Sequence, residues 1–256
     1  MSGLLEGHLA AVTGGASGIG RAIAKGFAAE GAEVVILDAN AEAAAAVCGD
    51  IREAGHKAQS MALDVRDRAM CARIARQVTE AIGPVSILVN SAGINRRNPI
   101  TGDRETVAQD WDDIMGVNLD GMFNVTQAFL EPLRARKGRV INIGSIQSFM
   151  HVRWPNSPAY TTSKHGVLGL TRAIAVEMAP LGVRCNCIIP GFIRTEALDR
   201  IPDEQKGKIE ARIPMRHMGS CEELAEVAAF LLSDAASHVT GQDWAVDGGV
   251  LESIEV

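Results

Sequence analysis

The segment from His8 to Gly20 reads HLAAVTGGASGIG, an apolar, β-forming run that leads into a glycine-rich turn. The residues that follow, up to Glu30, are small and apolar at helical spacing, so the turn joins a strand to a helix. Glycines at positions 14, 18 and 20 permit a tight turn and let a bound group approach the backbone. Unpaired N–H groups at the helix N-terminus favour an anion such as a pyrophosphate. The spacing is Gly-x-x-x-Gly-x-Gly rather than Gly-x-Gly-x-x-Gly, and the position between strand and helix is what predicts phosphate binding.

β-Rich runs alternate with helix-forming stretches along almost the whole chain. The predicted strands are residues 8–13, 33–38, 58–65, 86–90, 139–143, 183–189 and 244–246. The predicted helices are residues 18–30, 41–54, 69–82, 110–133, 159–179 and 222–232. Apolar strands separated by helices are typical of a parallel sheet that is covered on both faces. We therefore expect an α/β fold, with residues 1–256 forming a single Rossmann-type domain around a doubly wound, parallel, seven-stranded sheet.

The longest stretch without regular periodicity is Phe192–Met218, which contains Pro202 and Pro214. Irregular segments of this length inside a compact domain are usually binding loops or lids. Residues 192–218 are therefore predicted to form a substrate-binding loop.

The composition is that of a globular protein, since 47% of the residues are hydrophobic and 22% are charged. A formal net charge of −6, without a long basic block, argues against nucleic-acid binding. No apolar run is long enough to cross a bilayer, and the N-terminus lacks the pattern of a signal peptide, so we expect a cytoplasmic protein. The five cysteines contain no Cys-x-x-Cys motif and the six histidines no His-Glu-x-x-His motif, so neither disulfides nor a metal site are predicted.

Asp38 ends the second apolar strand and follows the glycine-rich turn at a spacing seen in dinucleotide-binding folds. An acidic side chain at this position accepts hydrogen bonds from the adenosine ribose. The alternative role is a cap for the next helix, although Asp38 stands slightly early for that. Residues 16, 17, 39 and 40 include no arginine or lysine to receive a 2′-phosphate, which the Asp38 carboxylate would repel. These features predict NAD rather than NADP as the cofactor.

Tyr160 is the only tyrosine of the chain and stands four residues before Lys164. Residues at this spacing share one face of a helix, so the ammonium group can lie beside the phenol. A phenol with a pKa of about 10 is a poor base at neutral pH, but a nearby cation favours its ionised form. Ser145 follows the strand 139–143 and supplies a hydroxyl that can hold a substrate oxygen. Each feature alone is a weak signal, because such pairs and strand-end serines also arise by chance.

Together these features resemble the short-chain dehydrogenase/reductase family over nearly the whole chain. Further matching segments are Asp64-Val65, Asn90-Ser91-Ala92-Gly93, Asn118, Pro190-Gly191 and Asp247-Gly248-Gly249. Ser91 departs from the family pattern, which usually has a second asparagine there. The resemblance implies that Tyr160 is the general acid/base and that Ser145 orients the substrate oxygen. It also implies that Lys164 binds the nicotinamide ribose and supports ionisation of the phenol, while Asn118 holds a water that links Lys164 to solvent.

The resemblance also implies where the cofactor binds. Asp64 and Val65 would contact the adenine, and residues 90–93 would flank the ribose and brace the glycine-rich turn. The predicted NAD-binding residues are Thr13, Gly14, Ser17, Gly18, Ile19, Gly20, Asp38, Asp64, Val65, Asn90, Ala92, Gly93, Tyr160, Lys164, Pro190, Gly191, Ile193 and Thr195. The implied reaction transfers a hydride between NAD and a secondary alcohol or hemiacetal, with Tyr160 taking the hydroxyl proton.

Substrate contacts in this family come from the segments after the fourth strand and after Ser145, and from the loop 192–218. The candidates in the first two segments are Asn95, Arg96, Arg97, Gln147, His151 and Arg153. Arginine suits planar recognition of oxyanions, so we expect an anionic sugar derivative, either a sugar acid or a sulfo-sugar. The chain looks most like the branch with gluconate 5-dehydrogenase and 2-deoxygluconate 3-dehydrogenase, and it also resembles polyol dehydrogenases. Arg96 and Arg97 would equally suit a solvated loop or a salt bridge between subunits.

Two alternatives to this dehydrogenase stay open. One is an enzyme for a neutral polyol or a 3-ketoacyl-type reductase, although the latter usually uses NADP, against which Asp38 argues. The other is a non-catalytic NAD-binding regulator, which the complete catalytic set disfavours. The family commonly forms tetramers through its long helices, here 110–133 and 159–179, so a homotetramer is expected. Neither a membrane nor a nucleic acid is an expected partner.

Overall fold

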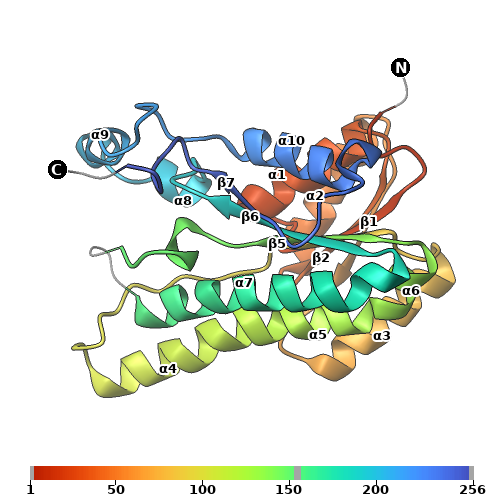
Figure 1. Cartoon of the computed structure of the whole chain (residues 1–256), viewed down its shortest axis with the longest axis horizontal. Coiled ribbons are helices and arrows are strands. Elements are labelled where there is room, and N and C mark those ends of the chain that lie inside the picture. Colours follow the sequence, from red (N-terminus) through yellow and green to blue (C-terminus); the bar gives the residue numbers. More distant parts are fainter. Residues whose placement is uncertain (1–2, 153–156, 254–256) are drawn as a thin grey trace.

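The computed structural model describes residues 3–152 and 157–253, which surround one seven-stranded sheet (Figure 1). The strands are β1 (Leu9–Thr13), β2 (Glu33–Asp38), β3 (Ala58–Ala62), β4 (Ile87–Asn90), β5 (Arg139–Ile143), β6 (Arg184–Pro190) and β7 (Asp243–Val246). Their order across the sheet is β3-β2-β1-β4-β5-β6-β7, and every neighbouring pair is parallel. The doubly wound parallel sheet predicted from the sequence is confirmed.

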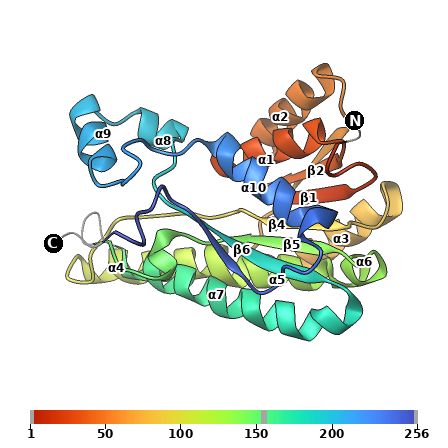
Figure 2. The ribbon, with the colours of Figure 1, turned by 45° about the horizontal axis from the view of Figure 1, so that its top comes forward.

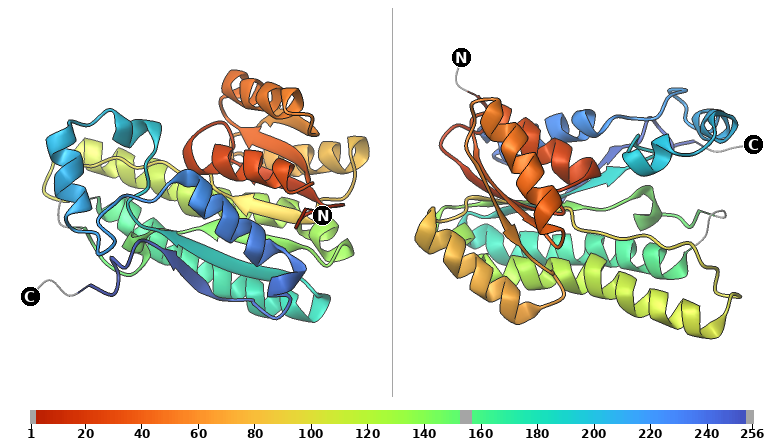
Figure 3. Two further views of the ribbon diagram at one scale, coloured as in Figure 1. Left: turned by 90° about the horizontal axis from the view of Figure 1, so that it is seen from above. Right: turned by 180° about the vertical axis from the view of Figure 1, so that it is seen from behind.

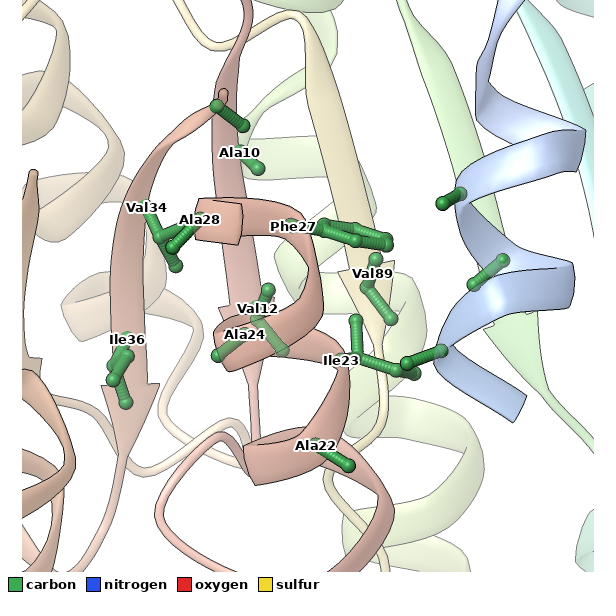
Figure 4. Close-up of a cluster of buried hydrophobic side chains, with 14 of the residues drawn as sticks. Ala10, Val12, Ala22, Ile23, Ala24, Phe27, Ala28, Val34, Ile36 and Val89 are labelled. Atoms are coloured by element: carbon green, nitrogen blue, oxygen red, sulfur yellow. The ribbon is translucent and has the colours of Figure 1, made fainter. Parts of the chain in front are cut away.

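Helices cover both faces of the sheet, as Figures 2 and 3 show. One face carries α1 (Gly18–Ala29), α2 (Ala41–Glu53) and α10 (Cys221–Leu232). The other carries α3 (Arg68–Ala81), α4 (Arg104–Met115), α5 (Gly121–Ala128), α6 (Leu130–Ala135) and α7 (Pro158–Met178). Ile23 and Phe27 of α1 are fully buried over Val12 and Val89 of the sheet (Figure 4). Within the described residues, no helix combines the length and the apolar character needed to cross a bilayer.

Two predicted elements differ from the structure. The third strand ends at Ala62 rather than at residue 65, because the chain turns at Asp64, which accepts a hydrogen bond from the N–H of Arg66 (3.0 Å). The helix expected over residues 110–133 begins earlier, at Arg104, where the side chain of Asp103 caps it. A π-helical turn, Gly116–Asp120, then interrupts this helix, and α5 ends at residue 128 before the short α6 begins.

The prediction that residues 192–218 are irregular throughout is wrong. This segment contains α8 (Glu196–Asp199) and α9 (Asp203–Glu210). No residue of α9 is buried, so the helix lacks the apolar periodicity by which helices are recognised in a sequence. Two acidic residues in its first turn and an ion pair between Glu204 and Lys208 (2.6 Å) stabilise it locally instead.

Candidate active site

The carboxyl ends of β1 and β4 meet where the strand order reverses, which is the usual binding crevice of an open α/β sheet. Thr13, the last residue of β1, ties the two strands together. Its Oγ1 donates to the carbonyl of Val89 (3.3 Å) and accepts from the N–H groups of Ser91 (3.1 Å) and Ala92 (3.2 Å). Thr13 and Ala92, both predicted cofactor residues, therefore lie together at this crevice.

The glycine-rich turn is shaped to admit a phosphate group. Gly14 has a φ of +66°, and a Cβ at this residue would lie 2.8 Å from the Cα of Ala92. A Cβ on Gly20 would lie 2.2 Å from the carbonyl oxygen of Gly14, so α1 starts closer to the turn than any other residue would allow. Ser17, the N-cap of α1, makes no side-chain cap hydrogen bond, which leaves the first-turn N–H groups of Gly18 and Ile19 to an anion. These features fit the diphosphate of a dinucleotide.

Asp38 lies beside this turn at the end of β2. Its carboxylate accepts hydrogen bonds from the N–H groups of Ala16 (3.1 Å) and Asn40 (2.9 Å). The cap of α2 is Asn40, whose side chain accepts from the N–H of Ala43 (3.0 Å), so capping is not the role of Asp38. A negative charge therefore stands at the glycine-rich turn, as expected for an acceptor of ribose hydroxyls.

Two other predicted cofactor residues have partners within the chain. Both oxygens of Asp64 accept hydrogen bonds from the guanidinium of Arg66, which hold the pKa of the Asp64 carboxyl below its usual range. Asn90 is buried, and its Nδ2 donates to Asn142 Oδ1 (2.9 Å) and Thr126 Oγ1 (3.0 Å). The side chain of Asn90 thus braces β4 against β5 and α5, whereas Asp64 stays at the surface after β3.

Of the last four predicted cofactor residues, Pro190 ends β6, and the segment after it contains Gly191, Ile193 and Thr195. The Cγ2 of Thr195 lies 3.7 Å from the place where a Cβ of Gly18 would stand, so this segment reaches the glycine-rich turn. An ion pair between Arg21 of α1 and Glu196 of α8 holds the two together. The predicted substrate-binding segment, residues 192–218, is therefore in direct contact with the glycine-rich turn and α1.

The helix α7 carries the predicted catalytic pair. Ser157 caps this helix by accepting from the N–H of Tyr160 (3.3 Å), and Pro158 occupies its first position, so the helix begins just before the tyrosine. The Nζ of Lys164 lies 5.6 Å from the centroid of the Tyr160 ring and donates to the carbonyl of Ile143 (2.7 Å) at the end of β5. Lys164 is 5% exposed, so water screens its charge weakly.

Asn118 lies in the π-helical turn between α4 and α5 and is fully buried. Its Oδ1 accepts from the N–H of Ile94 (2.8 Å), and its Nδ2 donates to the carbonyl of Ile94 (3.0 Å) and to Ser163 Oγ (3.2 Å). A Cβ on Gly93 would lie 3.4 Å from Asn118 Oδ1 and 3.9 Å from Lys164 Nζ, so these three residues meet. Single π-turns often occur at functional sites, and here the turn brings Asn118 to Lys164, the predicted catalytic lysine.

Ser145 follows β5 and caps a short 3₁₀ turn by accepting from the N–H of Gln147 (3.2 Å). Thr161, which the sequence did not single out, links two predicted substrate residues. Its Oγ1 donates to Gln147 Oε1 (2.8 Å) and lies 2.7 Å from His151 Nδ1. Because the one hydroxyl proton of Thr161 goes to Gln147, His151 is the donor in the second hydrogen bond. The only signal for Thr161 in the sequence was its place beside Tyr160.

The predicted substrate residues after β4 differ in their surroundings. Arg96 forms a salt bridge within this chain, to Asp113 (2.6 Å) and Asp110 (3.2 Å) of α4. Arg97 is exposed and has no ion pair among the described residues. The two remaining candidates are Asn95, which is exposed, and Arg153, which lies outside the described residues.

Comparison with known proteins identifies the family. A family model described as enoyl-(acyl carrier protein) reductase matches residues 14–251. The 3-oxoacyl-(acyl-carrier-protein) reductase of Thermotoga maritima is 36% identical over 248 residues, which are 96% of this chain and 99% of the relative. The chain belongs to the short-chain dehydrogenase/reductase family. It is therefore an oxidoreductase that acts on CH–OH groups.

Solved structures of this family are closely similar. A putative NAD(P)-dependent gluconate 5-dehydrogenase from Beutenbergia cavernae is 40% identical, with a TM-score of 0.90 over 97% of this chain and 98% of that chain. A gluconate 5-dehydrogenase from Burkholderia cenocepacia, solved in complex with NADP and tartrate, is 35% identical, with a TM-score of 0.90 over 98% and 97%. The predicted membership of the short-chain dehydrogenase/reductase family and its Rossmann-type fold are confirmed.

The cysteines of this short-chain dehydrogenase/reductase are core residues, because all five are buried. Burial raises the pKa of the Cys71 thiol to about 11, so this thiol stays protonated at neutral pH. Among the described residues, no group of three or more His, Cys, Asp and Glu side chains could hold a metal ion.

Proposed function

We propose that this chain is an NAD-dependent dehydrogenase that oxidises a secondary alcohol or hemiacetal of an anionic sugar derivative. The observation that carries the proposal is the meeting of Tyr160, Lys164 and Asn118 beside a glycine-rich turn that Asp38 faces. The structural neighbours named as gluconate dehydrogenases support a sugar acid, and a sulfo-sugar offers the same negative charge.

Each catalytic side chain has one task in this proposal. Tyr160 accepts the hydroxyl proton of the substrate on its ionised phenol oxygen, a form that the nearby ammonium of Lys164 favours, and becomes a neutral phenol. The hydroxyl of Ser145 holds the substrate oxygen and limits the charge that develops on it. Asn118, which meets Lys164 at Gly93, would hold the water that returns the proton to solvent. A bound nicotinamide supplies the acceptor for the hydride.

The preference for NAD is supported by the surroundings of Asp38. Its carboxylate stands at the glycine-rich turn between Ala16 and Asn40, where a 2′-phosphate would meet a negative charge. No arginine or lysine occurs at residues 16, 17, 39 or 40 to offset that repulsion. The gluconate 5-dehydrogenase of Burkholderia cenocepacia, in contrast, was solved in complex with NADP.

Steady-state kinetics with both cofactors test this preference. We expect a higher kcat/KM with NAD, and Asp38→Ala should reduce the ratio of NAD to NADP efficiency by about 10- to 150-fold. The substitution removes a ribose acceptor and a repulsive charge together. Glu42→Gln, which removes an exposed charge from the first turn of α2, is the matched control and should keep the preference. Equal efficiency of the unmodified protein with NAD and NADP would contradict the role given to Asp38.

Three of the predicted substrate side chains support an anionic substrate. Gln147 uses its Oε1 to accept from Thr161, so its NH₂ group is left as a donor. His151 donates through Nδ1 to Thr161 Oγ1. Arg97 offers an exposed guanidinium on the loop after β4. Tartrate, which the Burkholderia cenocepacia structure contains, is itself a dicarboxylate.

A panel of sugar acids, sulfo-sugars and matching neutral polyols tests the substrate class. We expect the acidic compounds to be preferred, and Arg97→Gln should lower their kcat/KM by about 10- to 150-fold, the loss of one charge-assisted hydrogen bond. The same variant should turn over neutral polyols normally. Arg104→Gln removes an exposed arginine at the far end of the same loop and is the matched control. A neutral polyol turned over better than every acidic compound, by the unmodified protein and by Arg97→Gln alike, would replace this proposal.

A second candidate is reduction of a 3-oxoacyl group, because the relative from Thermotoga maritima is named for that reaction. Acetoacetyl-CoA with NADPH belongs in the same panel for this reason. Faster turnover of that pair than of any sugar derivative would assign the second function. The negative charge of Asp38 argues against it, since NADPH carries the 2′-phosphate.

The proposed enzyme is a cytoplasmic homotetramer. Apolar side chains stay exposed on the long helices that the family uses for association: Trp111 on α4 (43%), Phe123 on α5 (42%) and Val176 on α7 (75%). Burial of such side chains against a second copy would stabilise an oligomer.

A further inference from the structure

A row of alternating charges joins the end of β3 to the loop between β4 and α4, drawn in yellow in Figure 1. Asp64 accepts from Arg66 through both oxygens, with the shortest contact at 2.7 Å. The Nη1 of Arg66 lies 3.7 Å from Asp113 Oδ1 on α4. The other oxygen of Asp113 accepts a 2.6 Å hydrogen bond from Arg96 of the loop, which also binds Asp110. The row therefore begins at a predicted adenine contact and ends on a predicted substrate loop.

The α4 end of this row is the more buried one. Asp110 is 6% exposed and also accepts from Asn98 Nδ2 (2.6 Å), so two side chains of the loop are anchored on one carboxylate. The side chain of Asp113 is 20% exposed, whereas that of Arg66 is 52% exposed. Hydrogen bonds from Arg96 hold the pKa of the Asp113 carboxyl below its usual range, so this group is ionised at neutral pH. Salt screens partly buried pairs less than exposed ones, so the ion pairs on α4 stay strong at physiological salt.

We propose that Arg66, Asp113 and Arg96 are positioning residues that couple the cofactor site to the order of the loop between β4 and α4, residues 94–103. The inference rests on the proposed contact between Asp64 and the adenine of the cofactor. A group bound to Asp64 restrains the Asp64 carboxylate and, with it, the guanidinium of Arg66. Arg66 in turn restrains Asp113, which holds the loop through Arg96. Coupling of this kind is reciprocal, so a ligand that orders the loop strengthens binding at the cofactor site. In this proposal Arg96 positions the loop through Asp113, whereas Arg97 binds the substrate anion.

Hydrogen–deuterium exchange tests this coupling without any substrate. In the unmodified protein, saturating NADH should slow exchange of the amides of residues 94–103 by about fivefold or more, the lower end of the range for coupled sites. Asp113→Asn keeps the shape of the side chain and removes its charge. This variant should still bind NADH but reduce the slowing to less than about twofold. Arg66→Gln removes the ion pair between Arg66 and Asp113 at a half-exposed position and should give the same result. A loss of the effect in both variants then does not depend on a folding defect of Asp113→Asn.

Asp50→Asn is the matched control, because it breaks a 2.6 Å ion pair with Lys25 on the opposite face of the sheet. This control should keep the full effect of NADH on the loop. Arg96→Lys retains a charge that can reach a carboxylate and should preserve part of the effect, whereas Arg96→Gln should abolish it. The coupling is overturned if NADH binds without slowing exchange in the unmodified protein. It is also overturned if the slowing persists in both Asp113→Asn and Arg66→Gln. A protein that fails to bind NADH would instead overturn the proposed function, and this inference with it.

Discussion

Replacing Tyr160 with phenylalanine should lower kcat by about 10²- to 10⁴-fold while NADH still binds. The substitution removes only the hydroxyl that takes the substrate proton, and the ring keeps its place beside Lys164, 5.6 Å from the ammonium nitrogen. The chain has no second tyrosine whose phenol could take over the proton transfer. Steady-state kinetics with the best substrate of the panel measures kcat, and a fluorescence titration with NADH measures binding.

The matched control for this prediction is Thr162→Val, which removes a hydroxyl from an exposed position on the same helix. This variant should keep a near-normal kcat. Near-normal turnover by Tyr160→Phe would exclude Tyr160 from the catalytic set. Loss of NADH binding along with turnover would indicate a damaged fold, which thermal melting followed by circular dichroism would reveal.

The sheet could be predicted from the sequence because its strands have a distinctive composition. Parallel strands covered on both faces are continuous apolar runs, and residues 34–37 of β2 are fully buried. The glycine-rich turn was equally readable, since a Cβ at Gly14 or Gly20 would collide with backbone atoms. In both cases a short stretch of sequence is enough to show the structural requirement: burial on both faces for the strands, and the absence of a Cβ for the turn.

The elements that escaped prediction lack such a local pattern. No residue of α9 is fully buried, and Ile209 alone packs against the core from the side, so no apolar repeat reveals this helix in the sequence. The π-turn at Asn118 inserts one residue into a helical repeat that otherwise continues from α4 to α5. Such an insertion shifts the faces of the helix without changing its composition.

The same distinction separates the predictable part of the site from the rest. Tyr160 and Lys164 could be paired because their spacing places them on one helix face. The partners of Arg96, in contrast, are Asp110 and Asp113, 14 and 17 residues further along, and they meet Arg96 only because the loop packs on α4. An arginine near a predicted pocket therefore does not by itself indicate a substrate anion.

Replacing Lys164 with methionine should lower kcat/KM by about 10²- to 10⁴-fold and weaken NADH binding at the same time. Two interactions of the ammonium are lost, with the phenol of Tyr160 and with the proposed ribose hydroxyls, and each hydrogen bond to a charged group contributes about 1.5–3 kcal/mol. The Tyr160→Phe variant, in contrast, should lose turnover alone. The comparison of kcat, KM and the NADH Kd in the two variants therefore separates proton transfer from cofactor binding.

The stability of the Lys164→Met variant provides the control for a folding defect. Methionine leaves the carbonyl of Ile143 without the ammonium that now donates to it (2.7 Å), which costs about 1–3 kcal/mol. It also removes a charge from a site that is 5% exposed, which avoids the cost of desolvating that charge. Because these two effects oppose each other, Tm should shift by only a few degrees. Lys25→Met removes an exposed ion pair with Asp50 and should keep both activity and NADH affinity. An unchanged kcat/KM in a folded Lys164→Met variant would contradict the place of Lys164 in the site, whereas a lower kcat with unchanged NADH affinity would limit its role to supporting Tyr160.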